Sequence, residues 1–274
     1  MADDLSQEQI ESCLTGAFGR PLRFFESIGS TNSEAMEWAL QGAPHGAVVS
    51  ADHQTAGRGR WGRSWFSKAG ALLQFSLILR PDLPVNAHGL LTAGLGVAAA
   101  RAIDRVTGLS TRIKWPNDIT VDGKKVVGML VETSVLGSDI AVAVCGVGMN
   151  VHLAPEDLPN EIKSRASSIA IALGPRGEAP ARAELLCAFL REMEEVYGWL
   201  ESANAPERVI AEATERSAVL GREVVVQLAD GTEVTGTAER LQADGALELS
   251  DGTERIAFHV GEIAQLREVS DAAP

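Results

Sequence analysis

Apolar residues recur along the chain with two different periods, which predict an order of helices and strands. Residues 7–15 carry apolar positions at helical spacing and predict a short amphipathic helix. Residues 22–28, 47–52 and 72–79 are rich in β-branched or aromatic side chains, a composition typical of strands. The first part of the chain therefore predicts strands interspersed with helices.

A helix is also predicted between the first two strands. Thr31 is followed three residues later by Glu34, which is the spacing of a capping box. We therefore expect Thr31 to cap a helix that runs to about Leu40.

The middle of the chain predicts a buried helix followed by a run of strands. Residues 86–106 are apolar at helical spacing and rich in alanine. Residues 111–121 and 126–136 are predicted strands joined at Asp122-Gly123, a dipeptide that suits the positive φ angles of a tight hairpin turn. Residues 139–147 continue this sheet.

The last third of the chain changes from helices to short strands. Apolar residues from Leu185 to Leu200 recur at steps of four and three and predict a helix over residues 181–201, and Pro206 begins another that ends near residue 217. From Val219 onward, three Asp-Gly pairs separate short β-rich runs. We expect an α+β main domain over residues 1–217, with helices packed on a mixed sheet, and a small antiparallel barrel or sandwich over residues 218–270.

The charge of the chain restricts its partners. Its 274 residues include 45% hydrophobic and 22% charged residues, and the formal net charge is −13. Long-range electrostatics therefore oppose unspecific binding to DNA, RNA or an anionic membrane. The longest apolar stretch, residues 89–102, is interrupted by Thr92 and Arg101, and the acidic start lacks the basic region of a signal peptide. We expect a cytoplasmic protein without a membrane partner.

Cysteines and histidines show no catalytic or metal-binding pattern. Cys13, Cys145 and Cys187 are widely separated and form no C-x-x-C pair, so we expect reduced structural thiols. The five histidines show neither H-x-x-x-H nor H-E-x-x-H spacing. A metal centre built from protein side chains alone is not expected.

One loop reverses the acidic balance of the chain. Gly57-Arg58-Gly59-Arg60-Trp61-Gly62-Arg63 places three guanidinium groups on a glycine-rich backbone, and Trp65 follows. Guanidinium groups bind carboxylates and phosphates, and glycine permits close approach of the backbone. The loop predicts a site for an anionic small molecule, with a solvated basic loop as the alternative. A nicotinamide fingerprint is excluded because a strand, not a helix, follows the glycines.

Two further motifs each allow a structural or a functional interpretation. Lys114-Trp115-Pro116-Asn117-Asp118 forms a structural corner or one wall of a site, with Lys125 on an otherwise apolar strand nearby. Gly123-Lys124 lacks a following serine or threonine, so any ATP binds without a Walker loop. Gly146-Val147-Gly148-Met149-Asn150 ends an apolar strand, either as a bulge or as a close backbone approach to a ligand.

Read in order, these motifs resemble those of the biotin protein ligases. The resemblance rests on Ser30-Thr31-Asn32, Gln54 with the loop to Trp65, Lys114 to Asp118, Lys125-x-x-Gly128 and Gly146-x-Gly148-x-Asn150. It covers about residues 22–151, and the β-rich tail is similar to the SH3-like barrel that ends those enzymes. The resemblance implies a class II synthetase-like catalytic domain.

The resemblance also implies a reaction in two steps. Biotin and ATP, with Mg²⁺, form biotinyl-5′-AMP, and the biotinyl group then passes to a lysine of a biotin carboxyl carrier protein domain. The implied catalytic residues are Lys125, Arg60 and Asp118. Lys125 bridges the biotin carboxyl group and the α-phosphate, Arg60 belongs to a lid over the intermediate, and Asp118 orients Lys125 or contacts Mg²⁺.

Two sets of binding residues follow from the same resemblance. The residues implied for biotin are Ser30, Thr31, Asn32, Gln54, Gly57, Arg58, Gly59, Arg60, Lys125 and Gly128. The residues implied for ATP and the adenylate are Arg60, Arg63, Trp65, Asn117, Lys125 and Asn150.

The sequence also bears on DNA binding, on the oligomeric state and on two alternative functions. About twenty residues precede the first predicted strand, too few for the DNA-binding domain of bifunctional ligases, so we expect no DNA binding, and a monomer or weak homodimer. A lipoate ligase or octanoyl transferase of the same fold is the nearest alternative, but its glycine-triplet loop is absent from the sequence. A nucleic-acid module that stacks bases on Trp61 and Trp65 is disfavoured by the acidic charge.

Overall fold

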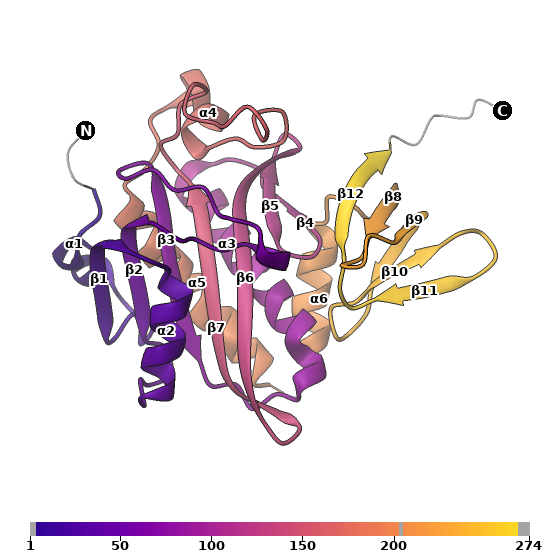
Figure 1. The fold of residues 1–274 in the computed structure, drawn as a ribbon, viewed down its shortest axis with the longest axis horizontal. Helices are drawn as coiled ribbons and strands as arrows, with labels where there is room; N and C mark the ends of the chain where they lie inside the picture. The colour runs from indigo at the N-terminus through magenta and orange to yellow at the C-terminus, as the bar shows by residue number, and fades with distance from the viewer. Residues whose placement is uncertain (1–3, 203–204, 268–274) are drawn as a thin grey trace.

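A seven-stranded mixed sheet lies at the centre of the main domain (Figure 1), in the order β1-β2-β3-β7-β6-β5-β4. The structure is a computed structural model that describes residues 4–202 and 205–267. Residues 1–3 and 268–270, at the outer ends of the two predicted domains, lie outside the described residues.

The strands of this sheet agree closely with the strand pattern of the sequence. They are β1 (Leu22–Ile28), β2 (Val48–Gln54), β3 (Leu72–Leu79), β4 (Arg112–Lys114), β5 (Asp118–Val121), β6 (Lys124–Leu136) and β7 (Asp139–Asn150). β1 pairs with β2 in parallel, and the other neighbouring strands pair antiparallel. The predicted turn between β5 and β6 is confirmed, because Asp122 and Gly123 both have positive φ, at 49° and 75°.

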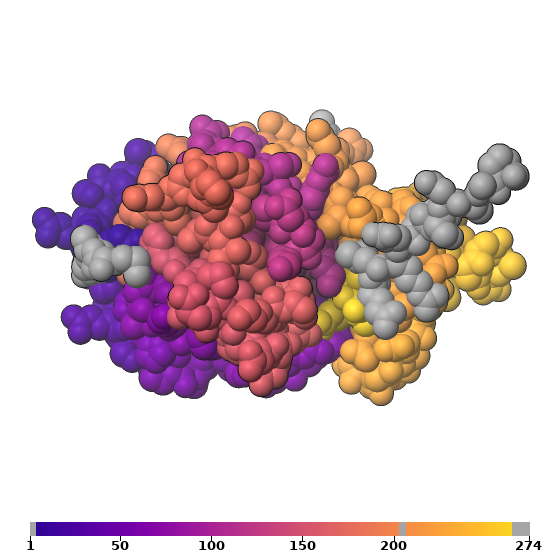
Figure 2. Space-filling view, turned by 90° about the horizontal axis from the view of Figure 1, so that it is seen from above, coloured from indigo at the N-terminus to yellow at the C-terminus, as the bar shows by residue number. Residues whose placement is uncertain are grey.

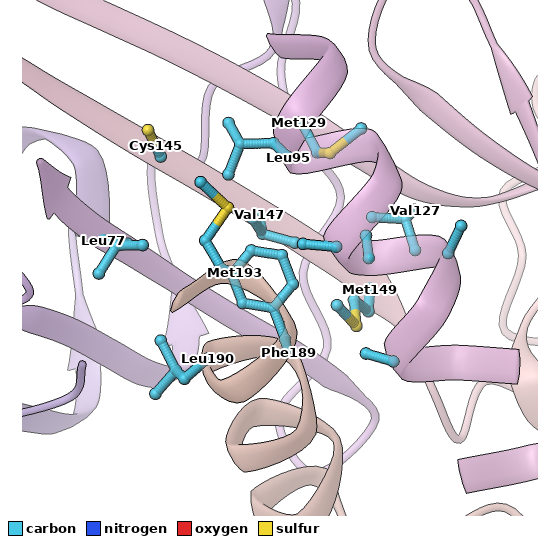
Figure 3. Packing of buried hydrophobic residues seen from close by; sticks show 14 of the residues in the cluster. Leu77, Leu95, Val127, Met129, Cys145, Val147, Met149, Phe189, Leu190 and Met193 are labelled. Carbon is cyan, nitrogen blue, oxygen red and sulfur yellow. The ribbon is translucent and has the colours of Figure 1, made fainter. Parts of the chain in front are cut away.

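Helices cover both faces of the sheet. They are α1 (Gln7–Cys13), α2 (Thr31–Leu40), η1 (Arg60–Gly62), η2 (Val85–Ala87), α3 (His88–Thr107), α4 (Ile169–Leu173), η3 (Gly174–Arg176), α5 (Arg182–Leu200) and α6 (Ala205–Glu215). α3 and α5 pack on one face, where Phe189 and Met193 of α5 lie among side chains of α3 and the strands (Figure 3). α2 packs on the opposite face against Val49, Ile78 and Val144. A strand covered on both sides is mostly apolar; β3 is buried along its whole length, and its two polar residues, Gln74 and Ser76, are hydrogen-bonded.

One predicted strand is wrong as a single element. Residues 111–121 form two short strands, β4 and β5, because the chain turns at Trp115 and Pro116. Pro116 has no N–H to donate to a ladder, and the Trp115 side chain is buried in the core of the C-terminal sheet. The corner therefore attaches the end of β4 to the second part of the molecule.

The C-terminal residues form a five-stranded antiparallel sheet at one end of the molecule (Figures 1 and 2). Its strands are β8 (Glu223–Gln227), β9 (Glu233–Leu241), β10 (Leu247–Ser250), β11 (Arg255–Phe258) and β12 (Glu262–Arg267), in the order β11-β10-β9-β8-β12. The three predicted Asp-Gly turns connect β8 to β11 in succession, with positive φ at Gly231, Gly245 and Gly252. A second, small antiparallel sheet is thus confirmed.

Contacts beside Trp115 join this sheet to the main domain. The Trp115 indole N–H donates to the Gly245 carbonyl oxygen at 3.1 Å. Gly245 also lies against Gly89 at the start of α3, so closely that a Cβ on Gly245 would fall 2.4 Å from the Gly89 carbonyl carbon. Between the start of α3 and the turn from β9 to β10, backbone therefore lies against backbone with no room for a side chain.

The expectation that all cysteines are reduced is wrong for two of them. Cys13 on α1 and Cys187 on α5 form a disulfide across 174 residues of sequence. The packing of α1 against α5 brings these residues together. Because they are far apart in the sequence, no local spacing indicates the disulfide. Among the described residues, Cys145 is the free cysteine, and its burial in β7 raises the pKa of its thiol.

In the part of the chain that the structure describes, no helix has the length and apolar character needed to span a membrane.

Candidate active site

A cavity of about 690 Å³ collects the motifs that the sequence analysis singled out. Its walls are the start of α2, the arginine-glycine loop, the corner at residues 114–118, the glycine positions of β6 and β7, and the start of β12. The cavity is lined by these predicted site residues: Ser30, Thr31, Asn32, Gln54, Arg58, Gly59, Arg60, Arg63, Trp65, Asn117, Asp118, Lys125, Gly128 and Asn150. Gly57 is not in the lining; its carbonyl oxygen accepts from the Trp65 N–H at 2.9 Å and closes the base of the loop.

The start of α2 brings three buried polar residues to one end of the cavity. Ser30, not Thr31, occupies the N-cap, and no side chain caps the helix, so the predicted capping box is wrong. Thr31 is instead held by Gln54, whose Oε1 accepts from the Thr31 backbone N–H at 2.7 Å and lies 3.2 Å from Oγ1. The tertiary bond to Gln54 replaces the local cap and joins α2 to the end of β2.

A chain of side-chain amides fixes the orientation of Gln54. Its Nε2 donates to Oε1 of Gln74 at 2.9 Å, and Nε2 of Gln74 donates to Oγ of Ser67 at 2.9 Å. Gln74 is fully buried within β3. Because each amide accepts at one end and donates at the other, the carboxamide of Gln54 is held with its oxygen toward α2.

Glu132 of β6 is a site residue that the sequence analysis missed. Its Oε2 accepts from Nδ2 of Asn32 at 2.8 Å and pairs with Nη2 of Arg58 at 2.8 Å. One carboxylate thus holds both the start of α2 and the first arginine of the loop. A single acid on a largely apolar strand was the available signal in the sequence.

Glycines in β6 and β7 make room for Asn32 and Trp65. A Cβ on Gly146 would fall 2.1 Å from Oδ1 of Asn32. Gly128 and Gly148 pair in register across the two strands, and a Cβ on either would fall 2.7 and 2.5 Å from the Trp65 ring, respectively. The glycines of this motif therefore serve a close approach by side chains of the protein itself. The Trp65 indole N–H is buried and has no hydrogen-bond partner among the residues that the structure describes.

Lys125 and Asp118 form an ion pair in the cavity wall. Nζ of Lys125 lies 2.6 Å from Oδ1 of Asp118 and 5.4 Å from the centroid of the Trp65 ring. Asp118 pairs in register with Gly128 on one side and with Lys114 on the other. The amine is thereby positioned between the carboxylate and the flat face of the indole.

Asn117 and Asn150 are positioned by bonds to backbone. Nδ2 of Asn117 donates to the Met129 carbonyl oxygen at 2.6 Å, which fixes the corner to β6. Asn150 ends β7, is almost fully buried, and donates from Nδ2 to the Ser167 carbonyl oxygen at 2.8 Å. In both residues the amide is committed to orienting the wall.

The arginine-glycine loop folds back on itself and reaches the C-terminal sheet. Its backbone closes through Gly59 N–H to the Arg63 carbonyl oxygen at 2.7 Å. Nη1 of Arg60 donates to the Gly261 carbonyl oxygen at 2.7 Å, and Nη1 of Arg63 pairs with Oε2 of Glu262 at 2.5 Å. The loop thus spans the cavity from the main domain to the start of β12.

The aromatic and cationic residues of this loop differ in how deeply they are buried. Burial lowers the pKa of Arg60, against the opposing charges of Glu262 and Asp118. Trp61, at φ 57°, is 39% exposed, and the guanidinium groups of Arg60 and Arg63 lie beside its ring. Trp65, by contrast, lies in the cavity. Of these two tryptophans, Trp65 is the one that lines the cavity.

The charges in the cavity favour an anionic occupant. The cationic side chains in its lining are Arg58, Arg60, Arg63, Lys114, Lys125 and Arg165, whereas its carboxylates are Asp118 and Glu262. Within the described residues, no group of three or more histidine, cysteine, aspartate or glutamate side chains is arranged to hold a metal ion. A divalent cation would therefore need ligand oxygens, such as phosphate oxygens, beside Asp118.

The sequence matches known protein ligases. Residues 24–150 match the biotin/lipoate A/B protein ligase family. The chain is 34% identical over 271 residues to the biotin–[acetyl-CoA-carboxylase] ligase of Mycobacterium tuberculosis, and the match covers 96% of both proteins. It is 41% identical over 173 residues to the bifunctional ligase/repressor BirA of Bacillus subtilis, covering 63% of this chain and 53% of BirA. The match thus spans only about half the length of that relative.

The fold is also that of a solved ligase. A biotin protein ligase from Aquifex aeolicus, in complex with biotin and ATP, superposes with a TM-score of 0.75 at 28% identity, covering 90% of this chain and 98% of that one. Each of these two matches covers at least 90% of this chain. The chain therefore belongs to the biotin protein ligase family.

Proposed function

We propose that this protein is an ATP-dependent ligase that attaches biotin to a specific lysine of a biotin carboxyl carrier protein domain. The observation that carries the proposal is the joint lining of one cavity by the amide-rich start of α2 and by a cluster of cations. Relatives named as biotin ligases over nearly their whole length support it. Mg²⁺ would enter with ATP.

The proposed reaction has two steps. In the first, a carboxylate oxygen of biotin attacks the α-phosphorus of ATP. The bond from that phosphorus to the bridging oxygen breaks, and its electron pair leaves with pyrophosphate. In the second, the neutral amine of the acceptor lysine attacks the acyl carbon of biotinyl-5′-AMP, AMP leaves with the electrons of the C–O bond, and the amine loses a proton.

The chemistry of the side chains suggests how they share this work. The polar groups of Ser30, Thr31, Asn32 and Gln54 suit the ureido ring of biotin, which both donates and accepts hydrogen bonds. Lys125, held by Asp118, would neutralise the biotin carboxylate and the α-phosphate as they approach each other.

The loop and the remaining polar residues would bind and enclose the intermediate. We assign Gly57, Arg58, Gly59 and Gly128 to the biotin side, and Arg63, Trp65, Asn117 and Asn150 to the adenylate. Arg60, bonded across to Gly261, would hold the loop as a lid that excludes water from the mixed anhydride.

The remaining assignments are part of the same proposal. We assign the catalytic domain to residues 1–217, with the start of β12 closing one side of its cavity, and we interpret residues 218–270 as an SH3-like barrel. The net charge of −13 supports the absence of DNA binding. We further propose a cytoplasmic enzyme that is monomeric or weakly dimeric, although the Cys13–Cys187 disulfide runs against the reducing conditions of that compartment.

A coupled assay tests the function. Purified protein is incubated with biotin, ATP, Mg²⁺ and a biotin carboxyl carrier domain, and pyrophosphate release, the adenylate and the acceptor mass are measured. The proposal requires biotin-dependent pyrophosphate release and a mass gain that disappears when the acceptor lysine is replaced by arginine. Turnover with lipoate or octanoate in place of biotin would favour the alternative ligase of the same fold, and absence of any acyl-dependent release would refute both.

A further inference from the structure

The cations of the cavity differ in whether the protein supplies them with a partner. Arg58 pairs with Glu132, Arg63 with Glu262, and Lys125 with Asp118, while Arg60 donates to a carbonyl oxygen. Lys114 also lines the cavity, but its amine has no ion pair or hydrogen bond with any residue in 4–202 or 205–267.

Lys114 is nevertheless fixed in position by its backbone. It ends β4, opposite Asp118 in the antiparallel register. The next residue, Trp115, is 7% exposed and bonded to Gly245, so the strand end is anchored on both sides. A lysine on an anchored strand, with its amine toward a cavity, presents a charge at a defined place.

In the described part of the chain, no carboxylate near the Lys114 amine is free to pair with its positive charge. Burial lowers the pKa of Lys114, Lys125 and Arg165 lower it further, and Asp118 and Glu262 oppose the shift. Both carboxylates already pair with other cations, Lys125 and Arg63. An anion entering the cavity would therefore gain from this amine without first breaking an ion pair.

We propose that Lys114 binds the β- and γ-phosphates of ATP and retains the pyrophosphate group as it departs. This inference rests on the proposed function. Lys125 is committed to the carboxylate and the α-phosphate, so a different cation must receive the negative charge that moves onto pyrophosphate when the bridging bond breaks. Lys114 lies across β5 from the Lys125 strand, beside the Asp118 that holds Lys125.

Arg165 is the other cation in the lining whose side chain has no ion pair or hydrogen bond within residues 4–202 and 205–267, but this side chain is exposed. Its segment contacts β6 through its backbone, where the Arg165 carbonyl oxygen accepts from the Lys125 N–H at 2.9 Å. A solvent-exposed guanidinium has to lose more of its hydration when it binds an anion than a partly buried amine does, so its net gain is smaller. Lys114 is therefore the stronger anion site of the two.

Measuring the two half-reactions, formation of the adenylate and transfer to the carrier, distinguishes binding of pyrophosphate by Lys114 from a structural role. Exchange of labelled pyrophosphate into ATP requires pyrophosphate to bind, whereas transfer from pre-formed biotinyl-5′-AMP to the carrier does not. For Lys114→Met we expect the KM for pyrophosphate in the exchange to rise about tenfold or more, the range for losing one charge-assisted bond. Transfer from biotinyl-5′-AMP should stay within about twofold of wild type. Lys114→Arg should restore most of the pyrophosphate affinity.

The matched control is Lys124→Met, which removes the same charge from an exposed position at the start of β6. It should leave the pyrophosphate KM unchanged. If the methionine variant does not fold, as judged by thermal unfolding, Lys114→Gln carries the same expectation. An unchanged pyrophosphate KM, or an equal loss in both half-reactions, would overturn the role of Lys114. Absence of exchange in the wild-type protein would instead refute the proposed function.

Discussion

Nζ of Lys125 lies 2.6 Å from Oδ1 of Asp118, two residues brought together by antiparallel strands. The turn at Asp122-Gly123 reverses the chain between them, so a hairpin of a few residues delivers both the cation and the carboxylate that orients it. This geometry places Lys125 in the cavity independently of any ligand contact.

Lys125→Met should abolish most adenylation while preserving the fold. The variant removes the charge that would stabilise two converging anions, and a preorganised group of this kind contributes about 10²–10³ in rate. Biotin-dependent pyrophosphate release measures the loss, with Lys124→Met as the control for the hairpin. Near-normal release from Lys125→Met would remove this residue from the catalytic set.

Arg60→Ala should shorten the time for which the adenylate stays bound. The variant loses the 2.7 Å bond to the Gly261 carbonyl oxygen, which links the loop to the C-terminal sheet. We expect dissociation of labelled biotinyl-5′-AMP to accelerate about tenfold or more, as for loss of a hydrogen bond from a charged donor. Rapid filtration measures that rate, and unchanged retention would show that the loop does not seal the site.

Gly148→Ala should displace Trp65 and weaken ATP binding. The new Cβ would fall 2.5 Å from the indole, and overpacking of this kind costs about 1–3 kcal/mol. Gly29→Ala is the control, because a Cβ there meets nothing within 4 Å. Tryptophan fluorescence and ATP titration compare the two variants. Equal ATP affinity in both would mean that the indole position does not matter for the nucleotide.

The disulfide predicts the number of titratable thiols. Protein unfolded in denaturant without reductant should show one reactive thiol, that of Cys145, because Cys13 and Cys187 are bonded. Reduction before the assay should raise the number to three. A titration with a chromogenic disulfide reagent on freshly purified protein makes the measurement. Three thiols before reduction would show that the helices α1 and α5 pack without the covalent link.

The free energy of unfolding should decrease as the pH drops below 6.5, the ordinary pKa of a histidine. Burial lowers the pKa of His45 from 6.5, and its Nδ1 accepts from the Arg80 N–H at 3.1 Å. The unfolded chain therefore takes up a proton first, so the stabilisation is complete above pH 6.5 and declines below it. Chemical denaturation between pH 7 and about 5 measures the slope, and His45→Phe should flatten it. An unchanged slope in that variant would assign the effect to other groups.

Local patterns in the sequence were sufficient for most of the fold. The predominantly apolar run of residues 72–79 has the bounds of β3, because a strand covered on both faces is mostly apolar. A corner at residues 114–118 was one of two interpretations of the sequence, but the environment in which the Trp115 side chain is buried was not predictable. It depends on a contact with Gly245, 130 residues further along the chain.

Residues of the candidate site were likewise predicted where the signal is local in the sequence, and missed where it depends on the fold. Arg58, Arg60 and Lys125 were identified because charge in an apolar or glycine-rich setting is unusual. Glu132 was missed, since its importance comes from a shared contact with Asn32 and Arg58 that only the folded sheet creates. Thr31 was assigned to the cap for the same reason: its partner, Gln54, lies at the end of β2, 23 residues further along the chain.

The contact of Gly89 with Gly245 limits how the two sheets can move. With backbone against backbone, the C-terminal sheet has no freedom to swing toward α3, and the bond from Trp115 keeps it from turning about that point. A hinge in such a joint would act by opening away from α3. Release of product would then involve the separation of β12 from the arginine loop, while the corner that carries Asn117 and Asp118 stays fixed.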